Sequence, residues 1–155
     1  MICKVNRYLT PIYSAGWRAP VIAARLRAGA AVACPAEGVW GLSCDPFNEE
    51  AVLDVLQLEA REISTGLIVV AASADIFSAL LDPLPSSARG AILNSWPGPN
   101  TWLVPHRSCF PHWITGDSDD VAIRVTSAPA LKALCLAFDG PLVSTSANPA
   151  GLSPW

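Results

Sequence analysis

Apolar residues follow two different spacings along this chain of 155 residues. Helical spacing, bounded by proline, glycine or N-cap residues, predicts helices over residues 20–29, 48–58, 74–81, 87–93 and 129–138. Short apolar runs predict strands over residues 30–34, 67–72, 101–104, 121–125 and 141–143. Because strands alternate with helices, the sequence predicts an α/β layer architecture.

The segments between these elements are predicted to be turns and loops. Residues 1–17 show no periodicity, which predicts an irregular N-terminal arm. Residues 35–47 form a predicted loop with two glycines as its flexible points. Residues 105–118 form a longer predicted loop, which is either functional or mobile. Neither a repeat nor a linker divides the sequence, so we expect a single domain over residues 1–155.

The composition restricts the class of protein. Apolar residues make up 52% of the chain and charged residues 15%, so a sizeable hydrophobic core is expected and disorder is not. A net charge of −3 argues against strong overall affinity for nucleic acid, although a local basic face would survive that sum.

The cysteines and the apolar stretches indicate the compartment. Five cysteines are odd in number and lack a Cys-x-x-Cys pair, so neither a disulfide framework nor a structural zinc site is indicated. We expect buried or free thiols in a reducing compartment. No secretory signal is evident, and the apolar stretch at residues 21–35 is interrupted by Arg25 and Arg27. We therefore expect a cytoplasmic protein with no membrane partner.

Small polar residues gather where the last predicted strand ends, at residues 144–148 (Ser-Thr-Ser-Ala-Asn). Hydroxyls, an amide and backbone N–H groups at the carboxyl end of a strand can bind an anionic ligand. The alternative is an ordinary capped turn, since these residue types are common there. Arg124, inside a predicted strand, either faces solvent or anchors an anion. Arg61 is either a phosphate or carboxylate ligand or a surface residue.

Other polar residues have no assignable chemistry. Glu37 and Asp45 flank the glycine-containing loop, but the sequence does not show them to be a metal-binding or acid–base pair. His106 and His112 have no nucleophile at a recognisable spacing, so we expect neither to be catalytic, and no catalytic residue is assigned. The motifs Gly-x-x-x-x-Gly-Lys and Gly-x-Gly-x-x-Gly do not occur, so a bound nucleotide would be held in another way.

Four blocks of the sequence carry a resemblance to a known family. They are Pro-Ala-Glu-Gly-Val-Trp-Gly-Leu-Ser-Cys-Asp-Pro at 35–46, Trp-Pro-Gly-Pro-Asn-Thr at 96–101, Val-Ala-Ile-Arg-Val at 121–125 and Pro-Leu-Val-Ser-Thr-Ser-Ala-Asn at 141–148. In their order and spacing they resemble the threonylcarbamoyl-AMP synthase family, which has the YrdC-type domain. The resemblance covers residues 20–152. It implies an α/β fold with a twisted, open, mixed sheet flanked by helices around a concave face.

The resemblance also implies a reaction. Members of this family are nucleotidyltransferases that convert L-threonine, bicarbonate and Mg-ATP into threonylcarbamoyl-adenylate and pyrophosphate. Partner proteins of the tRNA threonylcarbamoyl-transfer machinery then pass the threonylcarbamoyl group to the adenosine beside the anticodon of tRNA. The implied cofactors are ATP and Mg²⁺, with the metal ligands unknown, and the further candidate partners are tRNA and double-stranded RNA.

The family's motifs imply ligand contacts at two sets of positions. The nucleotide-binding positions are Arg61, Thr101, Arg124, Ser146 and Asn148. The positions for threonine or bicarbonate are Ala36, Thr65 and Ser144.

Several positions depart from the family pattern. The lysine of the family's Lys-x-Arg motif is Glu59, which reverses the charge where polyphosphate should be neutralised. A basic or amide position is Thr65, and a threonine hydroxyl is absent at Ala36. Family chains usually continue beyond the Ser-x-Asn loop, whereas this sequence ends at Trp155. The first hypothesis is a synthase weakened by Glu59 and Ala36. The alternative is a catalytically impaired YrdC-like relative that acts as an RNA- or protein-binding module.

Overall fold

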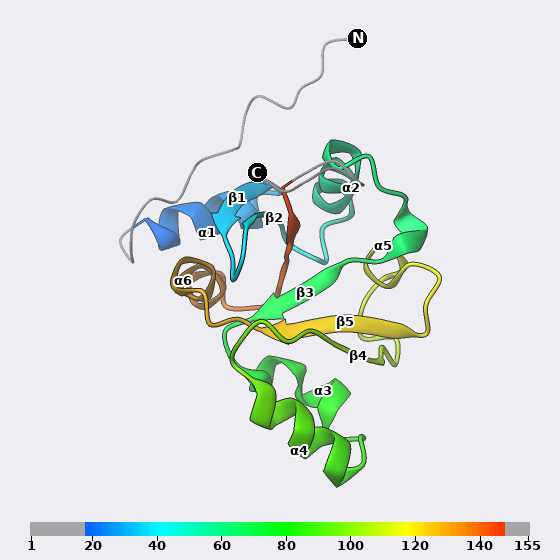
Figure 1. The fold of residues 1–155 in the computed structure, drawn as a ribbon. Helices are drawn as coiled ribbons and strands as arrows, with labels where there is room; N and C mark the ends of the chain where they lie inside the picture. Colours follow the sequence, from blue (N-terminus) through cyan, green and yellow to red (C-terminus); the bar gives the residue numbers. More distant parts are fainter. Residues whose placement is uncertain (1–17, 148–155) are drawn as a thin grey trace.

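Helices and strands alternate through residues 18–147, the part of the chain that the computed structural model describes (Figure 1). The helices are α1 (Ala19–Arg27), α2 (Glu49–Leu58), α3 (Ser78–Leu81), α4 (Ser86–Ser95), α5 (His112–Thr115) and α6 (Pro129–Phe138). The strands are β1 (Val32–Pro35), β2 (Trp40–Ser43), β3 (Ile68–Ala71), β4 (Trp102–Pro105), β5 (Asp120–Val125), β6 (Leu142–Val143) and β7 (Thr145–Ser146). The short 3-10 helices are η2 (Ile63–Thr65) and η3 (Ala74–Phe77). The expected α/β class is confirmed.

The longer helices begin where the sequence provides suitable first-turn residues. Pro20 lies in the first turn of α1, where its missing N–H leaves no helical hydrogen bond unmade. At α2 the Asn48 side chain accepts a hydrogen bond of 3.1 Å from the Ala51 N–H, as expected for an N-cap. Glu49 and Glu50 place negative charge at the positive end of that helix dipole. No helix in the described residues is long and apolar enough to cross a membrane.

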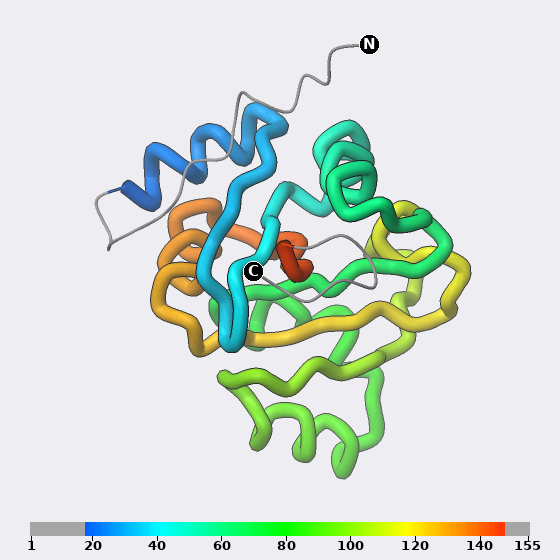
Figure 2. The backbone as a smooth tube through the Cα atoms, turned by 45° about the horizontal axis from the view of Figure 1, so that its top comes forward, coloured from blue at the N-terminus to red at the C-terminus, as the bar shows by residue number. Residues whose placement is uncertain are grey.

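The strands form two sheets that meet at the last extended segment. One sheet has the order β1-β2-β7 and is antiparallel, and the other has the order β4-β5-β3-β6, in which β3 and β5 are parallel. β6 pairs with β3, and β7 pairs with β2. Between them the Ser144 N–H donates to the Ile68 carbonyl at 2.9 Å. Residues 142–146, which we call the seam segment, are therefore hydrogen-bonded to both sheets (Figure 2).

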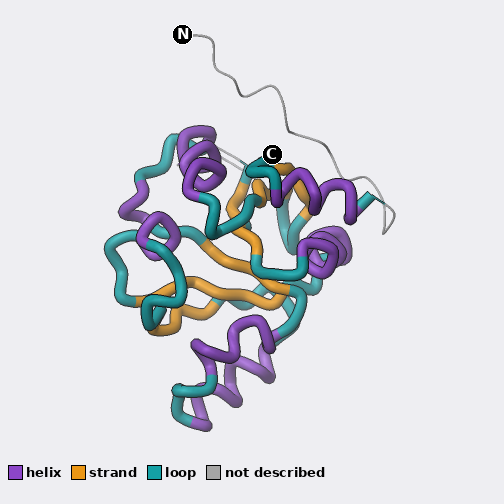
Figure 3. The backbone as a smooth tube through the Cα atoms, turned by 180° about the vertical axis from the view of Figure 1, so that it is seen from behind, coloured by secondary structure: helices purple, strands orange, loops and turns teal. Residues whose placement is uncertain are grey.

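Both faces of the four-stranded sheet are covered. Val69 and Ala71 of β3 pack into one hydrophobic cluster with residues of α2 and β5, whereas Val70 packs into a second cluster with residues of α1 and α6. This division follows from the alternation of side chains along a strand. Leu142 and Val143 of β6 divide between the two clusters in the same way. Helices α1 and α6 lie side by side near β1, whereas α3 and α4 lie beyond β4 (Figures 1 and 3).

Short elements differ from the sequence-based prediction. The predicted loop at 35–47 contains β2, the polar segment at 144–148 contains β7, and the predicted loop at 105–118 contains α5. β2 pairs with the neighbouring β1 and with β7, so the strand conformation of β7 depends on a partner far away in the sequence. The arm predicted for residues 1–17 lies outside the described residues.

Gly41 lets β2 approach β7 closely. A Cβ atom at Gly41 would lie 2.7 Å from the Thr145 carbonyl oxygen, which would force the two backbones apart. We expect Gly41→Ala to lower the free energy of unfolding by about 1–3 kcal/mol, the usual cost of overpacking, in urea denaturation. Gly38→Ala is the matched control, because a Cβ atom there would meet nothing within 4 Å. Equal stability of the two variants would contradict this role of Gly41.

Candidate functional site

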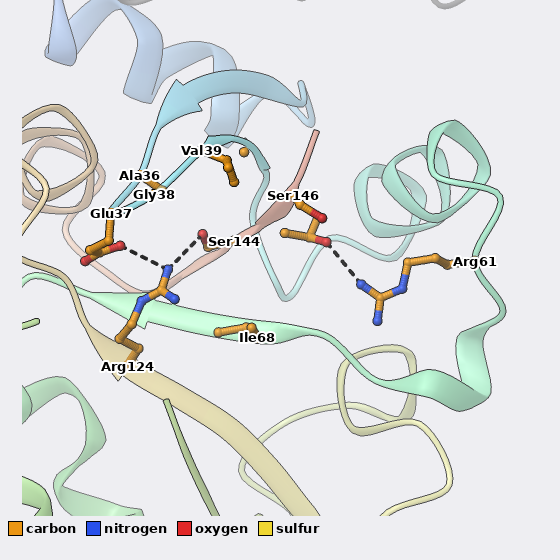
Figure 4. A pocket seen from close by; sticks show the side chains of 11 residues that line it. Ala36, Glu37, Gly38, Val39, Arg61, Ile68, Arg124, Ser144 and Ser146 are labelled. Carbon is orange, nitrogen blue, oxygen red and sulfur yellow. Dashed lines mark hydrogen bonds and ion pairs between the residues drawn. The ribbon is translucent and has the colours of Figure 1, made fainter. Parts of the chain in front are cut away.

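A pocket of about 250 Å³ lies beside the seam segment (Figure 4). Its walls come from the β1–β2 turn, from β2, β3 and β5, from the turn after α2 and from residues 144–146. Two guanidinium groups lie in this wall, those of Arg124 and Arg61, and Figure 4 shows them on opposite sides of the seam segment. The pocket therefore combines two cations with the hydroxyls of the seam segment.

Arg124 is held by contacts on one side of the pocket. It occupies the less buried face of β5, yet its side chain is only 12% exposed. Its Nη2 lies 3.2 Å from Glu37 Oε2 and donates to Ser144 Oγ at 3.4 Å, and its Nη1 donates to Thr101 Oγ1 at 3.5 Å. Of the two interpretations of Arg124, the solvent-facing one is wrong, because the side chain points into the pocket wall.

Glu37 is an ionised carboxylate beside Arg124. Its Oε1 accepts hydrogen bonds from the Thr126 hydroxyl at 2.5 Å and from the Ser127 N–H at 3.0 Å. Burial on its own would raise the pKa of Glu37, but these hydrogen bonds and the Arg124 charge outweigh burial and hold the pKa below its ordinary value. Glu37 is therefore charged at neutral pH.

Arg61 occupies the other side of the pocket. Its Nη1 donates to Thr145 Oγ1 and its Nη2 to the Gly66 carbonyl, each at 3.1 Å. Nη1 also lies 3.7 Å from Glu59 Oε2. The Arg61 side chain is 27% exposed, so the guanidinium remains within reach of a ligand. Arg61 is thus a member of the pocket wall and not an isolated surface residue.

Glu59 is buried behind Arg61, with a side chain only 1% exposed. Its Oε2 accepts a hydrogen bond of 2.9 Å from the Thr145 hydroxyl, while its Oε1 has no hydrogen-bond partner among the described residues. Burial raises the pKa of Glu59 above its ordinary value, and the Thr145 hydrogen bond and Arg61 only partly offset this rise. The two carboxylates beside the arginines therefore have pKa values shifted in opposite directions.

Most positions implied by the family resemblance come together in this pocket. Its wall contains Ala36, Arg61, Arg124, Ser144 and Ser146. Thr101 is not part of the wall and contacts it through Arg124. Thr65 is exposed on η2 and does not line the pocket. Asn148 lies outside the described residues. The two histidines, for which no catalytic role is expected, do not line the pocket either.

The sequence did not indicate the contacts that Glu37, Glu59 and Thr145 make in this site. Glu37 reaches Thr126 and Ser127, which lie 89 and 90 positions away. Glu59 and Thr145 are separated by 86 positions. In the sequence, these carboxylates are marked only by a nearby glycine or arginine. Such neighbours are common in any soluble protein and predict no contact. Only the folded chain brings these partners together.

A cluster of the usual metal-binding side chains is absent from residues 18–147. They contain no group of three or more His, Cys, Asp or Glu side chains that could hold a metal ion. Cys34, Cys44, Cys109 and Cys135 are free thiols, and burial raises the pKa of Cys34 and of Cys135 to about 12. The expectation of buried or free thiols is confirmed for these four cysteines.

Glu59 predicts a pH dependence of stability. Because its pKa is raised on folding, the folded chain keeps the Glu59 proton over a pH range in which the unfolded chain has lost it. The stability linked to this proton is complete below the unfolded pKa and is lost as the pH rises through the folded pKa. We therefore expect the free energy of unfolding of the wild type to fall relative to Glu59→Gln as the pH rises from acid to neutral. Urea denaturation of both proteins at several pH values measures this difference, and parallel profiles would contradict it.

Known proteins resemble this chain over most of its length. A family model named Sua5, YciO and YrdC, with the description "Telomere recombination", matches residues 24–155. The chain is 53% identical over 135 residues to a threonylcarbamoyl-AMP synthase of Stutzerimonas stutzeri (strain A1501). The matched region covers 87% of this chain and 72% of that protein. A threonylcarbamoyl-AMP synthase of Pseudomonas aeruginosa (strain UCBPP-PA14) is 51% identical over the same shares.

The fold resembles a solved structure as well. The crystal structure of P. abyssi Sua5 complexed with L-threonine has a TM-score of 0.80 at 30% identity and covers 95% of this chain. The present chain spans 43% of that Sua5 chain, less than half of its length. The family match and the identity to curated relatives both extend over most of the sequence. The chain therefore belongs to the Sua5/YciO/YrdC family.

Proposed function

We propose that this chain is a threonylcarbamoyl-AMP synthase, a nucleotidyltransferase that makes L-threonylcarbamoyladenylate from L-threonine, bicarbonate and ATP. The observation that carries the proposal is the convergence of Arg61, Arg124 and Ser146 on one pocket. These positions match the nucleotide-contacting motifs of the family, and the chain brings them together from widely separated segments. The 53% identity to a relative of that name supports the same assignment.

The pocket suits chemistry that depends on positioning and charge. In the proposed reaction the threonine nitrogen bonds to the carbon of bicarbonate with loss of water. An oxygen of the resulting carbamate then attacks the α-phosphorus of ATP, and pyrophosphate leaves. ATP, bicarbonate and the carboxylate of threonine are negatively charged. The Arg61 and Arg124 guanidinium groups would bind phosphate or carboxylate oxygens and stabilise the charge that moves during the transfer. No covalent intermediate with the protein is required.

The threonine and bicarbonate subsites are assigned to Ala36 and Ser144, both in the wall of the pocket. The structure of P. abyssi Sua5 complexed with L-threonine supports threonine as the amino acid. Thr65 and Asn148 stay as proposed contacts on the family pattern alone. We further propose that the product passes to the tRNA threonylcarbamoyl-transfer machinery and that the protein acts in the cytoplasm.

Mg²⁺ would accompany ATP in this proposal. In nucleotide sites Mg²⁺ is usually held by phosphate oxygens, by water and by one or two carboxylates. Glu37 and Glu59, the carboxylates beside the pocket arginines, already contact Arg124 and Thr145 through one oxygen each. We therefore assign no residue to the ion and no step of the reaction to it.

The alternative, a binding module for RNA or protein, has less support. The chain has ten basic residues and a net charge of −3, and each pocket arginine lies beside a carboxylate. This arrangement is unlike the continuous basic surface that binds nucleic acid backbones. A protein that makes no product but binds tRNA in a salt-sensitive manner would favour the alternative.

Arginine variants test the proposed enzyme. Purified protein with ATP, L-threonine and bicarbonate is expected to form threonylcarbamoyl-adenylate, detected by mass spectrometry. Arg124→Ala and Arg61→Ala are each expected to lower kcat/KM by about 30-fold or more, since losing a charge contact in a buried site costs on the order of 2–5 kcal/mol. Arg89→Ala is the matched control, because Arg89 is an exposed arginine of α4 outside the pocket wall. No product from the wild type, or equal loss in all three variants, would contradict the proposal.

The two departures from the family pattern are expected to act on different substrates. Glu59→Gln removes a negative charge 3.7 Å from Arg61 and should lower the KM for ATP by about fivefold to tenfold, the scale of repulsion between nearby charges. Ala36→Thr adds a hydroxyl to the pocket wall and should lower the KM for L-threonine without changing that for ATP. Steady-state kinetics of both variants measure these effects. A change in the same KM in both variants would show that the subsites are assigned wrongly.

A further inference from the structure

We propose that Glu37 is a positioning residue, whose carboxylate fixes the direction of the Arg124 guanidinium before an anionic ligand binds. The proposal rests on the proposed function for the identity of the ligand, ATP, but its structural basis is independent of that function. It names a residue of the β1–β2 turn to which neither the family motifs nor the sequence pattern gave a role.

One oxygen of Glu37 is fixed to the frame of the fold. Oε1 accepts from the Thr126 hydroxyl and from the Ser127 N–H, just before α6 begins. Thr126 is itself immobilised, because it is fully buried, its N–H donates to the Ala71 carbonyl of β3 at 3.1 Å and its hydroxyl accepts from the Ala128 N–H at 3.1 Å. The carboxylate is therefore attached to the junction of β5 and α6 and not only to its own turn.

The other oxygen of Glu37 supplies the charged contact of Arg124, an ion pair without hydrogen-bond geometry. Oε2 lies 3.2 Å from Nη2, and both side chains are 12% exposed, so water weakens this attraction less than at an open surface. The remaining contacts of the guanidinium are hydroxyls at 3.4 and 3.5 Å, which are long for hydrogen bonds. Nε has no hydrogen-bond partner among the described residues. Without the carboxylate, the neutral contacts would hold the guanidinium only weakly.

The pair still leaves Arg124 able to bind a ligand. A guanidinium has five N–H donors, and only some of them are used by Glu37, Thr101 and Ser144. Figure 4 shows the guanidinium between Glu37 and Ser144, within the pocket wall. Glu37 thus connects the three-stranded sheet, through its turn, to β5 of the four-stranded sheet while the remaining donors stay available. The low pKa of Glu37 keeps this connection charged at neutral pH.

The direction in which Glu37→Gln changes the affinity for ATP distinguishes a positioning role from an effect of charge alone. Glu37→Gln keeps an acceptor oxygen for Thr126 and Ser127 but removes a negative charge next to an anion-binding group. Coulomb attraction alone predicts that the variant binds ATP more tightly. Positioning predicts weaker binding, because the freed guanidinium must be ordered when the ligand arrives.

Glu59→Gln is the matched control for this experiment. It also replaces a carboxylate beside a pocket arginine, but the Glu59 carboxylate accepts one hydrogen bond, from Thr145, whereas the Glu37 carboxylate accepts two, from Thr126 and Ser127. In calorimetric titrations with ATP we expect Glu37→Gln to raise Kd by about tenfold, less than the hundredfold that a 1 Å misplacement can cost. We expect Glu59→Gln to lower Kd. An unchanged or lower Kd in Glu37→Gln would overturn the proposal.

A second measurement needs no ligand. In ¹⁵N spectra of the unliganded protein, a fixed guanidinium gives separate Nη signals, whereas a rotating one gives an averaged signal. We expect separate signals for Arg124 in the wild type, assigned with Arg124→Lys, and an averaged signal in Glu37→Gln. An averaged signal in the wild type would overturn the proposal even if the variant did not fold. Separate wild-type signals in a protein that neither binds ATP nor forms product would overturn the proposed function and support the positioning role.

Discussion

The hydrogen bonding of the seam segment to two sheets at once is the constraint on which the site depends. β6 completes the four-stranded sheet by pairing with β3, and β7 completes the three-stranded sheet by pairing with β2. Ser144 lies at the change of partner, where its N–H bonds to β3 and its hydroxyl accepts from Arg124. A pocket lies beside this segment and is lined by residues of both sheets. The polar residues of the segment lie in the pocket wall because the segment passes from one sheet to the other there.

The two guanidinium groups can lie in this wall without a ligand because each is compensated differently. Arg124 forms an ion pair with one oxygen of Glu37, and the other oxygen of that carboxylate accepts two hydrogen bonds. Arg61 is compensated mainly by neutral acceptors, Thr145 and Gly66, while Glu59 lies further away and keeps an oxygen without a partner. The guanidinium of Arg124 therefore has a closer carboxylate than the guanidinium of Arg61. A ligand anion would replace missing contacts at Arg61 and add to existing ones at Arg124.

Local features of the fold could be predicted from the sequence, and long-range pairings could not. The Asn48 cap and the proline of α1 depend on neighbouring residues, so the corresponding helices were expected near their observed positions. β2 pairs with the neighbouring β1, whereas β7 is a strand because it pairs with β2 across the chain, with Gly41 and Leu42 opposite Ser146 and Thr145. The motif resemblance identified the pocket arginines but no contact of Glu37, because its partners are set by the folding of the β1–β2 turn over the start of α6. The burial of Glu59 could not be predicted either, because its neighbours in the sequence form a polar connector.

The carboxylate of Glu59 does not disturb the strand pairing beside it. The Thr145 hydroxyl donates to Glu59 and accepts from Arg61, so one side chain of the seam segment bridges the carboxylate and the guanidinium. The pairing of β7 with β2 uses backbone groups and does not depend on the sign of that charge. The backbone pairings that build the pocket are therefore separate from the side-chain charge at position 59. The architecture does not depend on the charge at this position, because the hydrogen bonds that define the seam segment are made by the backbone.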